Sequence, residues 1–357
     1  MALVKSLEHW AKLTLAAFVA LLMLRPWRRA RTRQLASAKR ILLVRIDQRV
    51  GEVLLTTPLV NRLAGREVHL LVHPKMARVV EGLPGVARVW PFEKRLGSVL
   101  ALRAERFDAV VNCGNWSSPA VTSAIVSRLI AGRGVAVGPA TAPTSWLMDV
   151  AVTPLTEQPS EVLQRAHLVD GWATEGAPRL SFRAPRPSAE VRAFLASVGP
   201  RYAVVNPGGR LGERRVSAAA FAAGARVMAA TGVTPVVTWG PGEEALAQEV
   251  CAGCPEAVLA VATDLDGLAA ALSGAVMVLC NNTGPMHLAV AVGCPTLALF
   301  SRIDMRRWSH SGEASRSVDV TPLLDDSTGL ERVVEIETRS FLASRLPRAS
   351  EPQGSEI

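Results

Sequence analysis

The chain has 357 residues, of which 49% are hydrophobic and 20% are charged. At roughly 150 residues per domain this length predicts about two domains, and the apolar content is ample for packed cores, which excludes a disordered or fibrous protein. The formal net charge is +9, but residues 1–40 hold nine basic side chains and one acidic, a net of +8. The rest of the chain is close to neutral, which argues against a broad nucleic-acid-binding face.

The first segment, residues 1–39, combines an apolar run with a basic run. Leu13 to Leu24 read LTLAAFVALLML, and RPWRRARTR follows directly. Twelve helical residues reach about 18 Å against a hydrocarbon core of about 30 Å, so we expect an interfacial or partly inserted helix rather than a spanning one. The arginines follow the apolar run, which is unlike a signal peptide, and they would bind anionic lipid. We predict a membrane-associating arm that keeps the rest of the chain cytoplasmic; the alternative is a helix that docks on its own protein.

After this arm, apolar runs of strand character alternate with Ala-rich helical patterns. Runs rich in Val and Leu between helices are typical of buried parallel strands, so the sequence predicts α/β architecture. The predicted strand runs are ILLVRI from Ile41, VHLLV from Val68, AVVNC from Ala109, YAVVN from Tyr202, TPVVTW from Thr234, VMVLC from Val276 and TLALF from Thr296.

A shift in composition divides the body of the chain into two parts. Between Pro178 and Pro200 four prolines punctuate one short helical pattern. Each part on either side has the length of one Rossmann-like domain. We predict a first domain over 40–180, a linker over 181–200, a second domain over 201–344 and a disordered polar tail over 345–357.

The five cysteines are an odd number in a chain too long to need disulfide staples. This usage fits a reducing, cytosolic compartment. Cys251 and Cys254 form a CxxC, but no second pair and no nearby His completes a zinc set. We interpret these thiols as structural, and the sequence predicts no metal site.

No dinucleotide fingerprint or P-loop occurs, but three strand-to-helix turns are suited to phosphate. They are residues 44–58 (VRIDQRVGEVLLTTP), 206–210 (NPGGR) and 281–287 (NNTGPMH). In the last, Thr283 can cap a helix, Gly284 allows a ligand close to the backbone, and Pro285 suits the first helical turn. Backbone N–H groups at such a helix start favour a diphosphate. The alternative is simple capping of a buried helix, with His287 as a satisfied core histidine.

In this order and spacing, RIDQRVGEVLLTTP, NPGGR, TWGPGEE and NNTGPMHLAVAVGCPTLALF resemble segments of the lipopolysaccharide heptosyltransferases of glycosyltransferase family 9. The resemblance covers residues 40–330 and leaves out the arm. It implies a GT-B fold, in which two Rossmann-like domains face each other across a cleft. It also implies inverting, metal-independent transfer of a heptose or related sugar from an ADP-sugar to a lipopolysaccharide core or similar glycolipid. The expected location is the cytoplasmic face of the inner membrane.

On the acceptor side, the resemblance places the catalytic carboxylate at Glu52, in the pair Gly51-Glu52. The family has Asp there, so this is a departure; Glu keeps the carboxylate but is one methylene longer. Asp47 is the second candidate for the base, and its alternative role is a loop-stabilising hydrogen bond. Arg45 and Gly51 are the remaining acceptor-side candidates.

On the side of the sugar donor, the resemblance places a phosphate-binding cation at Arg214 or Arg215, with Arg210 as a further candidate. Arg stands here for the family's Lys and can clamp a diphosphate through two parallel hydrogen bonds. Asn282 replaces a family Asp, and Glu243 matches a position suited to ribose hydroxyls, unless it only serves a helix start. The direct matches, expected to contact the diphosphate and donor, are Thr283, Gly284, Pro285 and His287.

The two changed carboxylate positions leave three interpretations open. The chain is an active family member, a GT-B enzyme for another nucleotide sugar, or a catalytically silent, membrane-tethered binding or assembly protein. The expected partners of the first are a nucleotide-sugar donor, a glycolipid acceptor and an anionic membrane surface, with no nucleic acid. The oligomeric state is left open.

Overall fold

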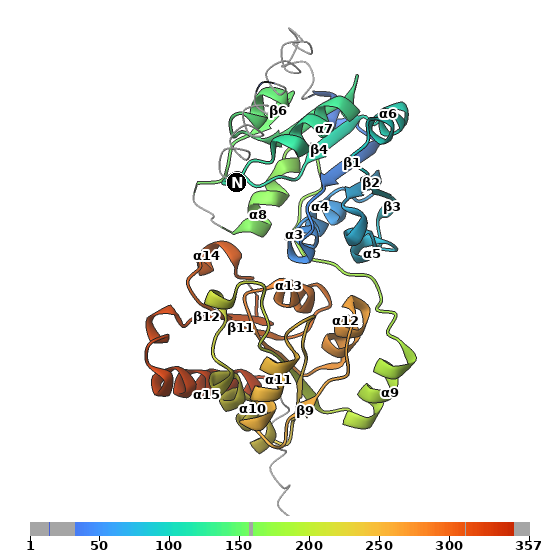
Figure 1. Ribbon diagram of the computed structural model, residues 1–357. Helices are drawn as coiled ribbons and strands as arrows, with labels where there is room; N and C mark the ends of the chain where they lie inside the picture. Colours follow the sequence, from blue (N-terminus) through green and yellow to red (C-terminus); the bar gives the residue numbers. More distant parts are fainter. Residues whose placement is uncertain (1–13, 15–32, 157–159, 311, 346–357) are drawn as a thin grey trace, which may run out of the picture. The chain divides into compact units, whose positions relative to one another are not determined.

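The computed structural model describes residues 14, 33–156, 160–310 and 312–345. Most of the predicted arm and nearly all of the predicted tail lie outside these residues. The chain forms two compact units, one ending at Arg183 and one beginning at Ala184, and this division falls inside the predicted linker. Figure 1 traces both units, and each is described by itself.

The first unit is built on sheet A, six parallel strands in the order β3-β2-β1-β4-β5-β6. β1 and β4 are almost fully buried because helices cover both faces of the sheet, as parallel sheets require. The strands are β1 (Arg40–Arg45), β2 (Glu67–Val72), β3 (Val86–Pro91), β4 (Ala109–Asn112), β5 (Val135–Pro139) and β6 (Val150–Val152).

The chain leaves sheet A in opposite directions from its centre. The connections from β1 run outward through β2 to β3, and those from β4 run outward through β5 to β6. Right-handed crossovers then place the two sets of helices on opposite faces. The helices are α3 (Val50–Leu54), α4 (Thr57–Arg62), α5 (Ala77–Val80), α6 (Leu96–Ala104), α7 (Val121–Ala131) and α8 (Glu161–Ala166), with 3-10 turns η1 (Pro74–Met76), η2 (Thr144–Leu147) and η3 (His167–Val169).

The residues just before β1 belong to the packed body of this unit. Leu35 and Ala38 are buried, at 1% and 3% exposure. Arg66 donates hydrogen bonds to the backbone oxygens of both residues, at 3.0 Å each. The packed first unit therefore begins by residue 35, within the last residues of the segment assigned to the arm.

The second unit repeats the pattern in sheet B, with the parallel order β12-β11-β10-β7-β8-β9. Its centre is the pair β7 and β10, which is buried along its length. The strands are β7 (Tyr202–Asn206), β8 (Thr234–Val237), β9 (Val258–Leu259), β10 (Val278–Asn281), β11 (Thr296–Phe300) and β12 (Ser315–Asp319).

The helices of the second unit pack in two groups, α10 with α11 and α15, and α12 with α13. The Ala-rich α10 lies close to the sheet and starts at Ser217, whose hydroxyl accepts a capping hydrogen bond. The helices are α9 (Ala189–Val198), α10 (Ala218–Ala230), α11 (Glu244–Ala252), α12 (Leu265–Gly274), α13 (Gly284–Ala291), α14 (Met305–Trp308) and α15 (Ser327–Ala343), with 3-10 turns η4 (Gly212–Arg214) and η5 (Thr321–Leu323).

The predicted α/β class is confirmed, and each of the seven predicted strand runs contains a strand. Five strands escaped prediction, namely β3, β5, β6, β9 and β12. Four of these lie at or next to a sheet edge and are short or only half-buried, so they lack a continuous apolar run. β5 is buried, but its run VAVGP is short and contains Gly and Pro.

Two further observations concern the predicted arm and the thiols. Within the part of the chain that the structure describes, no helix has both the length and the apolar character needed to cross a membrane. All five cysteines are free, and four of them are buried. The apolar run of the arm lies almost wholly outside the described residues.

Candidate active site

In each sheet there is one pair of neighbouring strands whose following connections run to opposite sides of the sheet. The candidate residues gather at these two switch points. In sheet A this is the carboxyl end of β1 and β4, and in sheet B it is the carboxyl end of β7 and β10. Open parallel sheets bind ligands at such switch points, because the diverging connections leave a crevice there.

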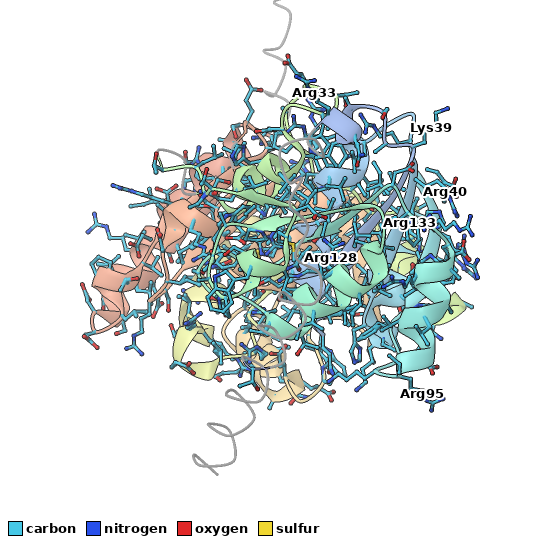
Figure 2. The ribbon with its side chains drawn as sticks, turned by 90° about the horizontal axis from the view of Figure 1, so that it is seen from above. Arg33, Lys39, Arg40, Arg95, Arg128 and Arg133 are labelled. Carbon is cyan, nitrogen blue, oxygen red and sulfur yellow. The ribbon has the colours of Figure 1, made fainter. Side chains whose placement is uncertain are left out.

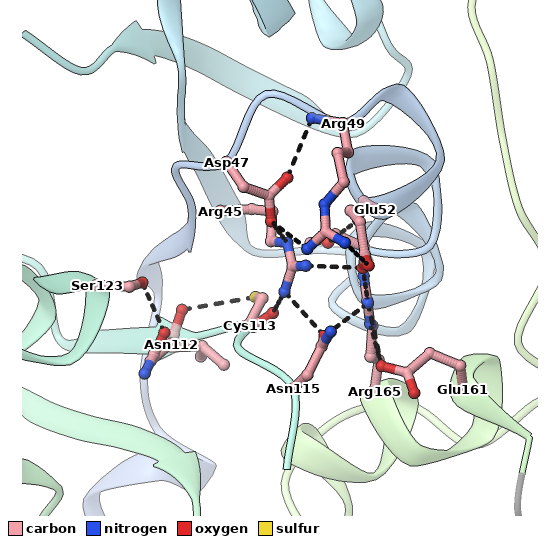
Figure 3. Close-up of polar contacts among 12 residues, drawn as sticks. Arg45, Asp47, Arg49, Glu52, Asn112, Cys113, Asn115, Ser123, Glu161 and Arg165 are labelled. Carbon is pink, nitrogen blue, oxygen red and sulfur yellow. Dashed lines mark hydrogen bonds and ion pairs between the residues drawn. The ribbon is translucent and has the colours of Figure 1, made fainter. Parts of the chain in front are cut away.

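At the switch point of sheet A, Glu52 lies on α3 and is only 5% exposed. Its Oε2 lies 2.7 Å from Arg45 Nη2 and pairs with Arg165 Nη2, and its Oε1 lies 3.3 Å from Arg49 Nη1. Arg165 also donates to the Glu52 backbone oxygen at 2.7 Å. Figure 3 shows the carboxylate enclosed by these three guanidinium groups.

This enclosure fixes the protonation state of Glu52. Burial alone would raise its pKa, but the charges of Arg165 and Arg45 outweigh burial and lower the pKa to about 2. A carboxylate with so low a pKa is a weak proton acceptor at neutral pH. In this arrangement Glu52 is therefore the anionic centre of an ion-pair cluster, with no free oxygen presented to an acceptor.

Asp47, in the loop between β1 and α3, is the more accessible carboxylate. Its side chain is 30% exposed; Oδ2 lies 2.7 Å from Arg45 Nε, and Oδ1 accepts from the Arg49 backbone N–H at 3.3 Å. These contacts orient the carboxylate. The loop-stabilising hydrogen bond considered from the sequence is present, and the partly exposed side chain is also open to an acceptor hydroxyl.

The other two acceptor-side candidates, Arg45 and Gly51, have structural roles. Arg45 is 5% exposed, and besides its two carboxylate partners it donates to the Cys113 and Asn115 oxygens. Gly51 lies within α3. Arg45 therefore orients Asp47 and Glu52, and it is too enclosed to meet a large acceptor.

Sequence reasoning missed four members of this cluster, namely Arg49, Asn115, Glu161 and Arg165. Arg165 is completely buried and also bonds the Asn115 side-chain oxygen at 2.8 Å and pairs with Glu161 at 3.1 Å. Arg165 and Glu161 lie four residues apart on α8, a spacing that usually marks an exposed helix pair. Asn115 follows β4. Their role in holding Glu52 becomes visible only in the folded structure, where they lie together around its carboxylate.

At the switch point of sheet B, the loop after β7 lies so close to neighbouring side chains that a Cβ on either glycine would crowd them. A Cβ on Gly208 would overlap the Glu243 carboxylate, and one on Gly209 would lie 3.0 Å from Thr283 Cγ2. The Gly208–Gly209 backbone thus reaches both the loop after β8 and the start of α13. The two predicted turns of this unit, 206–210 and 281–287, form one assembly with the loop that carries Glu243.

Glu243 and Arg215 hold this assembly together. Glu243 Oε1 accepts from the Gly209 N–H at 2.8 Å and lies 3.0 Å from Arg215 Nη2, and its Oε2 accepts from the Gly240 N–H at 3.2 Å. Arg215 Nε donates to the Gly209 oxygen at 2.6 Å. Both side chains are engaged in ordering the glycine loop, and Glu243 makes no capping bond to α11.

Asn281, at the end of β10, was not among the predicted site residues. It is 1% exposed; its amide nitrogen donates to the Pro207 oxygen at 2.7 Å, and its oxygen accepts from the Val216 N–H at 3.2 Å. Asn281 therefore fixes both ends of the loop between β7 and α10. The sequence offered only its position at a strand end as a signal.

The start of α13 brings the direct family matches together. Thr283 is the N-cap residue, but its hydroxyl donates to the Asn281 oxygen at 3.3 Å and does not cap the helix. Gly284 and Pro285 form the first turn, and Asn282 beside them is half-buried. Without a side-chain cap, this helix start can offer its N–H groups to an anion.

Two predicted cations lie free of this assembly. Arg210 and Arg214 are exposed, and neither side chain has a hydrogen bond or ion pair within the described part of the chain. Both follow the glycine loop directly. They are available to a ligand, whereas Arg215 is already bound to Glu243.

His287, on α13, is 5% exposed and lies against a second histidine that sequence reasoning missed. Its Nδ1 lies 2.7 Å from His310 Nε2, and the rings meet edge to face at 5.0 Å. Burial lowers the pKa of His310 to about 4, so that ring is neutral at physiological pH. Ser301, which follows β11, is 2% exposed, and its Oγ has no hydrogen-bond partner among the residues that the structure describes.

The described residues contain no group of three or more His, Cys, Asp or Glu side chains placed to hold a metal ion. The predicted independence from metal stays a prediction.

This chain has two units, each built on a parallel sheet with polar residues at its switch point. That is the architecture of the GT-B class of glycosyltransferases. The sequence profile of glycosyltransferase family 9 (heptosyltransferase) matches residues 97–323, more than half of the chain. The chain belongs to this family and is a glycosyltransferase. The matched range includes all donor-side candidates, whereas Asp47 and Glu52 lie before it.

Solved structures share the fold. E. coli heptosyltransferase WaaC with ADP is 20% identical, with a TM-score of 0.66 over 84% of this chain and 99% of its own. The family 9 glycosyltransferase of Veillonella parvula is 17% identical, with a TM-score of 0.70 over 86% and 97%. E. coli ADP-heptose lps heptosyltransferase II is 18% identical, with a TM-score of 0.66 over 85% and 99%. Among curated protein sequences, none matches this chain.

Proposed function

We propose that this protein transfers a heptose or related sugar from an ADP-sugar to a lipopolysaccharide core or similar glycolipid, with inversion and without a metal ion. The observation that carries the proposal is the assembly at the switch point of sheet B. There the glycine loop, Glu243, Arg215 and the start of α13 form one cradle beside two exposed arginines. The solved structures of E. coli WaaC with ADP and with ADP-2-deoxy-2-fluoro heptose support an ADP-sugar as the donor.

The diphosphate of the donor is the group that this cradle suits. Arg210 and Arg214 supply charge, and the uncapped start of α13 supplies backbone N–H groups and the positive end of a helix dipole. As the bond from the anomeric carbon to the diphosphate breaks, negative charge grows on the leaving phosphates. Fixed cations and N–H groups stabilise that charge without rearrangement.

For the proton of the acceptor hydroxyl, we assign Asp47 as the general base. Its carboxylate is oriented by Arg45 and remains 30% exposed, whereas Glu52 is enclosed and has a pKa of about 2. In the reaction the acceptor oxygen attacks the anomeric carbon from the face opposite the diphosphate. The hydroxyl proton passes to Asp47, the new glycosidic bond forms with inverted configuration, and ADP leaves.

We further propose that the protein works at the cytoplasmic face of the inner membrane. The apolar and basic runs of residues 13–33 support this location, because an apolar run followed by five arginines suits an anionic bilayer. A membrane-bound enzyme meets a glycolipid acceptor at a raised local concentration.

The test is release of ADP from ADP-heptose in the presence and absence of a lipid-linked core acceptor, with determination of the anomeric configuration of the product. Acceptor-dependent release with inversion supports the proposal. Turnover with a UDP- or GDP-sugar alone would indicate another nucleotide-sugar chemistry. The absence of both turnover and nucleotide binding would indicate a catalytically silent binding protein.

A further inference from the structure

A basic depression lies at the edge of sheet A where its strands begin, opposite the edge that carries Asp47. It has a volume of about 660 Å³ and lies between the residues before β1, the end of α6 and the turn after α7. Three of its lining residues are Arg103, Arg106 and Arg133. None of these residues belongs to the sites described above.

The guanidinium groups of this depression are largely unused by the protein itself. Arg106 and Arg133 are exposed, and in the described ranges neither makes a side-chain hydrogen bond or ion pair. Arg103 uses one nitrogen to bond the Leu129 backbone oxygen at 3.0 Å, and its guanidinium lies against Gly132. The lining therefore offers planar guanidinium groups of the kind that bind phosphate oxygens in pairs.

The carboxylates at this edge are already engaged. Asp108 accepts from the backbone N–H groups of Lys39 and Arg40 at 2.8 and 2.9 Å. Glu67 and Glu105 each lie 3.1 Å from Arg40. Six cations of this edge, Arg33, Lys39, Arg40, Arg103, Arg106 and Arg133, thus stand against three carboxylates, which leaves an excess of three positive charges.

Further cations extend this basic edge towards the N-terminal segment. Lys39 and Arg33 are exposed and, among the residues that the structure describes, have no side-chain partner. Figure 2 shows Lys39, Arg40 and Arg133 near one another at one margin of the molecule. In the sequence, Arg33 is the last of five arginines between residues 25 and 33, which follow the apolar run directly. The basic run of the sequence therefore leads into the basic edge of the fold.

We propose that this basic edge is a docking surface for the phosphate groups of an anionic bilayer, and that it orients the first unit on the membrane. The proposal rests on the proposed membrane location. It goes further because it states which edge of the folded unit faces the lipid. Together with the apolar run of the sequence, cations on a folded edge give the second attachment that stable membrane binding requires.

This orientation has a consequence for the acceptor. β1 runs from Arg40, at the basic edge, to Arg45, beside Asp47. At about 3.3 Å per residue, Asp47 stands about 20 Å from the docked edge. The hydroxyl that reacts must therefore lie about 20 Å from the lipid headgroups. A lipid that carries intervening sugars meets this requirement, and a lipid whose hydroxyl lies at the headgroup does not.

The experiment is hydrogen–deuterium exchange of the full chain with vesicles of phosphatidylcholine, with vesicles of an equimolar mixture with phosphatidylglycerol, and with inorganic phosphate. We expect residues 103–108 and 131–135 to be protected by the mixed vesicles alone. Equal protection by phosphatidylcholine, or none at all, would overturn the proposal. Equal protection by inorganic phosphate without vesicles would instead define a site for a small phosphorylated ligand, and it would also overturn lipid docking.

Charge variants give the second arm. Replacement of Arg103, Arg106 and Arg133 by Gln should weaken binding to the mixed vesicles about a hundredfold, since each cation near an anionic surface contributes about fivefold. The control replaces three exposed arginines elsewhere, R78Q/R332Q/R339Q, and should change binding little. Equal loss in both would overturn the proposal.

ADP titration separates this inference from the proposed function. Both triple variants should bind ADP like the unmodified protein. The basic edge lies in the first unit and the donor cradle in the second, and the control residues Arg332 and Arg339 lie on α15, outside the cradle. A chain that docks on mixed vesicles through this edge but binds no nucleotide would refute the proposed function alone.

Discussion

Replacing Glu52 by Gln should destabilise the first unit as well as disturb its chemistry. The substitution keeps the shape of the side chain but removes the negative charge that Arg45, Arg49 and Arg165 share. Arg165 is completely buried, so its charge would be left with Glu161 alone. Breaking a buried ion pair from one side is costly because the remaining charge cannot return to water.

The magnitude follows from the pKa of Glu52. The cluster lowers this pKa from 4.5 to about 2, and a shift of about 2.5 units corresponds to about 3 kcal/mol of folding free energy. Because the folded-state pKa is the lower one, this contribution is present above about pH 4.5 and is lost as the pH falls towards 2. At about 2–4 °C per kcal/mol, the E52Q variant should melt about 6–12 °C lower at neutral pH.

The assay is urea unfolding of the unmodified protein and the variant between pH 7 and pH 3. The difference in unfolding free energy should be constant near neutrality and shrink below about pH 4.5. Asp47→Asn is the matched comparison, because its partly exposed ion pair contributes at most about 1 kcal/mol. That variant should keep its unfolding midpoint yet lose about 10²–10⁴-fold in transfer rate. An E52Q protein of full stability without turnover, beside an active D47N protein, would refute the reasoning and make Glu52 the base.

Three further predictions concern the donor cradle and the arm. Gly208→Ala should lower ADP affinity at least tenfold, because its methyl group would overlap the Glu243 carboxylate that orders the loop. Gly212→Ala, with open space around it, should leave ADP affinity unchanged. Equal ADP titrations of the two variants would contradict this prediction. His310→Ala should weaken ADP binding about tenfold through the loss of its hydrogen bond to His287, and unchanged calorimetry would remove that pair from the site. Deletion of residues 1–32 should move the protein to the soluble fraction with ADP binding intact, and persistence in membranes would argue against the arm as the anchor.

The sequence was most informative where one physical constraint decides the residue type. Buried central strands must be apolar on both faces, so the runs at β1, β4, β7 and β10 predict their strands directly. Edge strands such as β12 face solvent in part, so they carry both polar and apolar side chains and show no continuous apolar run. The glycine pair of the β7 loop stood out in the sequence, and in the structure the side chains of Glu243 and Thr283 lie so close to its backbone that a Cβ would crowd them.

The candidate site was predictable only in part, because side chains meet through the fold and not through spacing. Asp47 and Glu52 were both found, but their division of roles depends on Arg165, which lies more than a hundred residues away. An arginine on a helix is ordinarily exposed, and nothing local marks this one as buried. His310 and Asn281 were missed for the same reason, since each acts on a residue of another element.

The most direct test of the account is calorimetric titration of the protein with ADP, UDP and GDP, beside the Arg214→Ala variant and, as a control, Arg332→Ala on the exposed side of α15. The account predicts selective binding of ADP, reduced about tenfold or more by the loss of Arg214, whose charge-assisted hydrogen bonds to phosphate are among the strong ones. The control should bind ADP like the unmodified protein. Absence of binding for all three nucleotides, or ADP binding that is indifferent to Arg214, would contradict the assignment of the donor site.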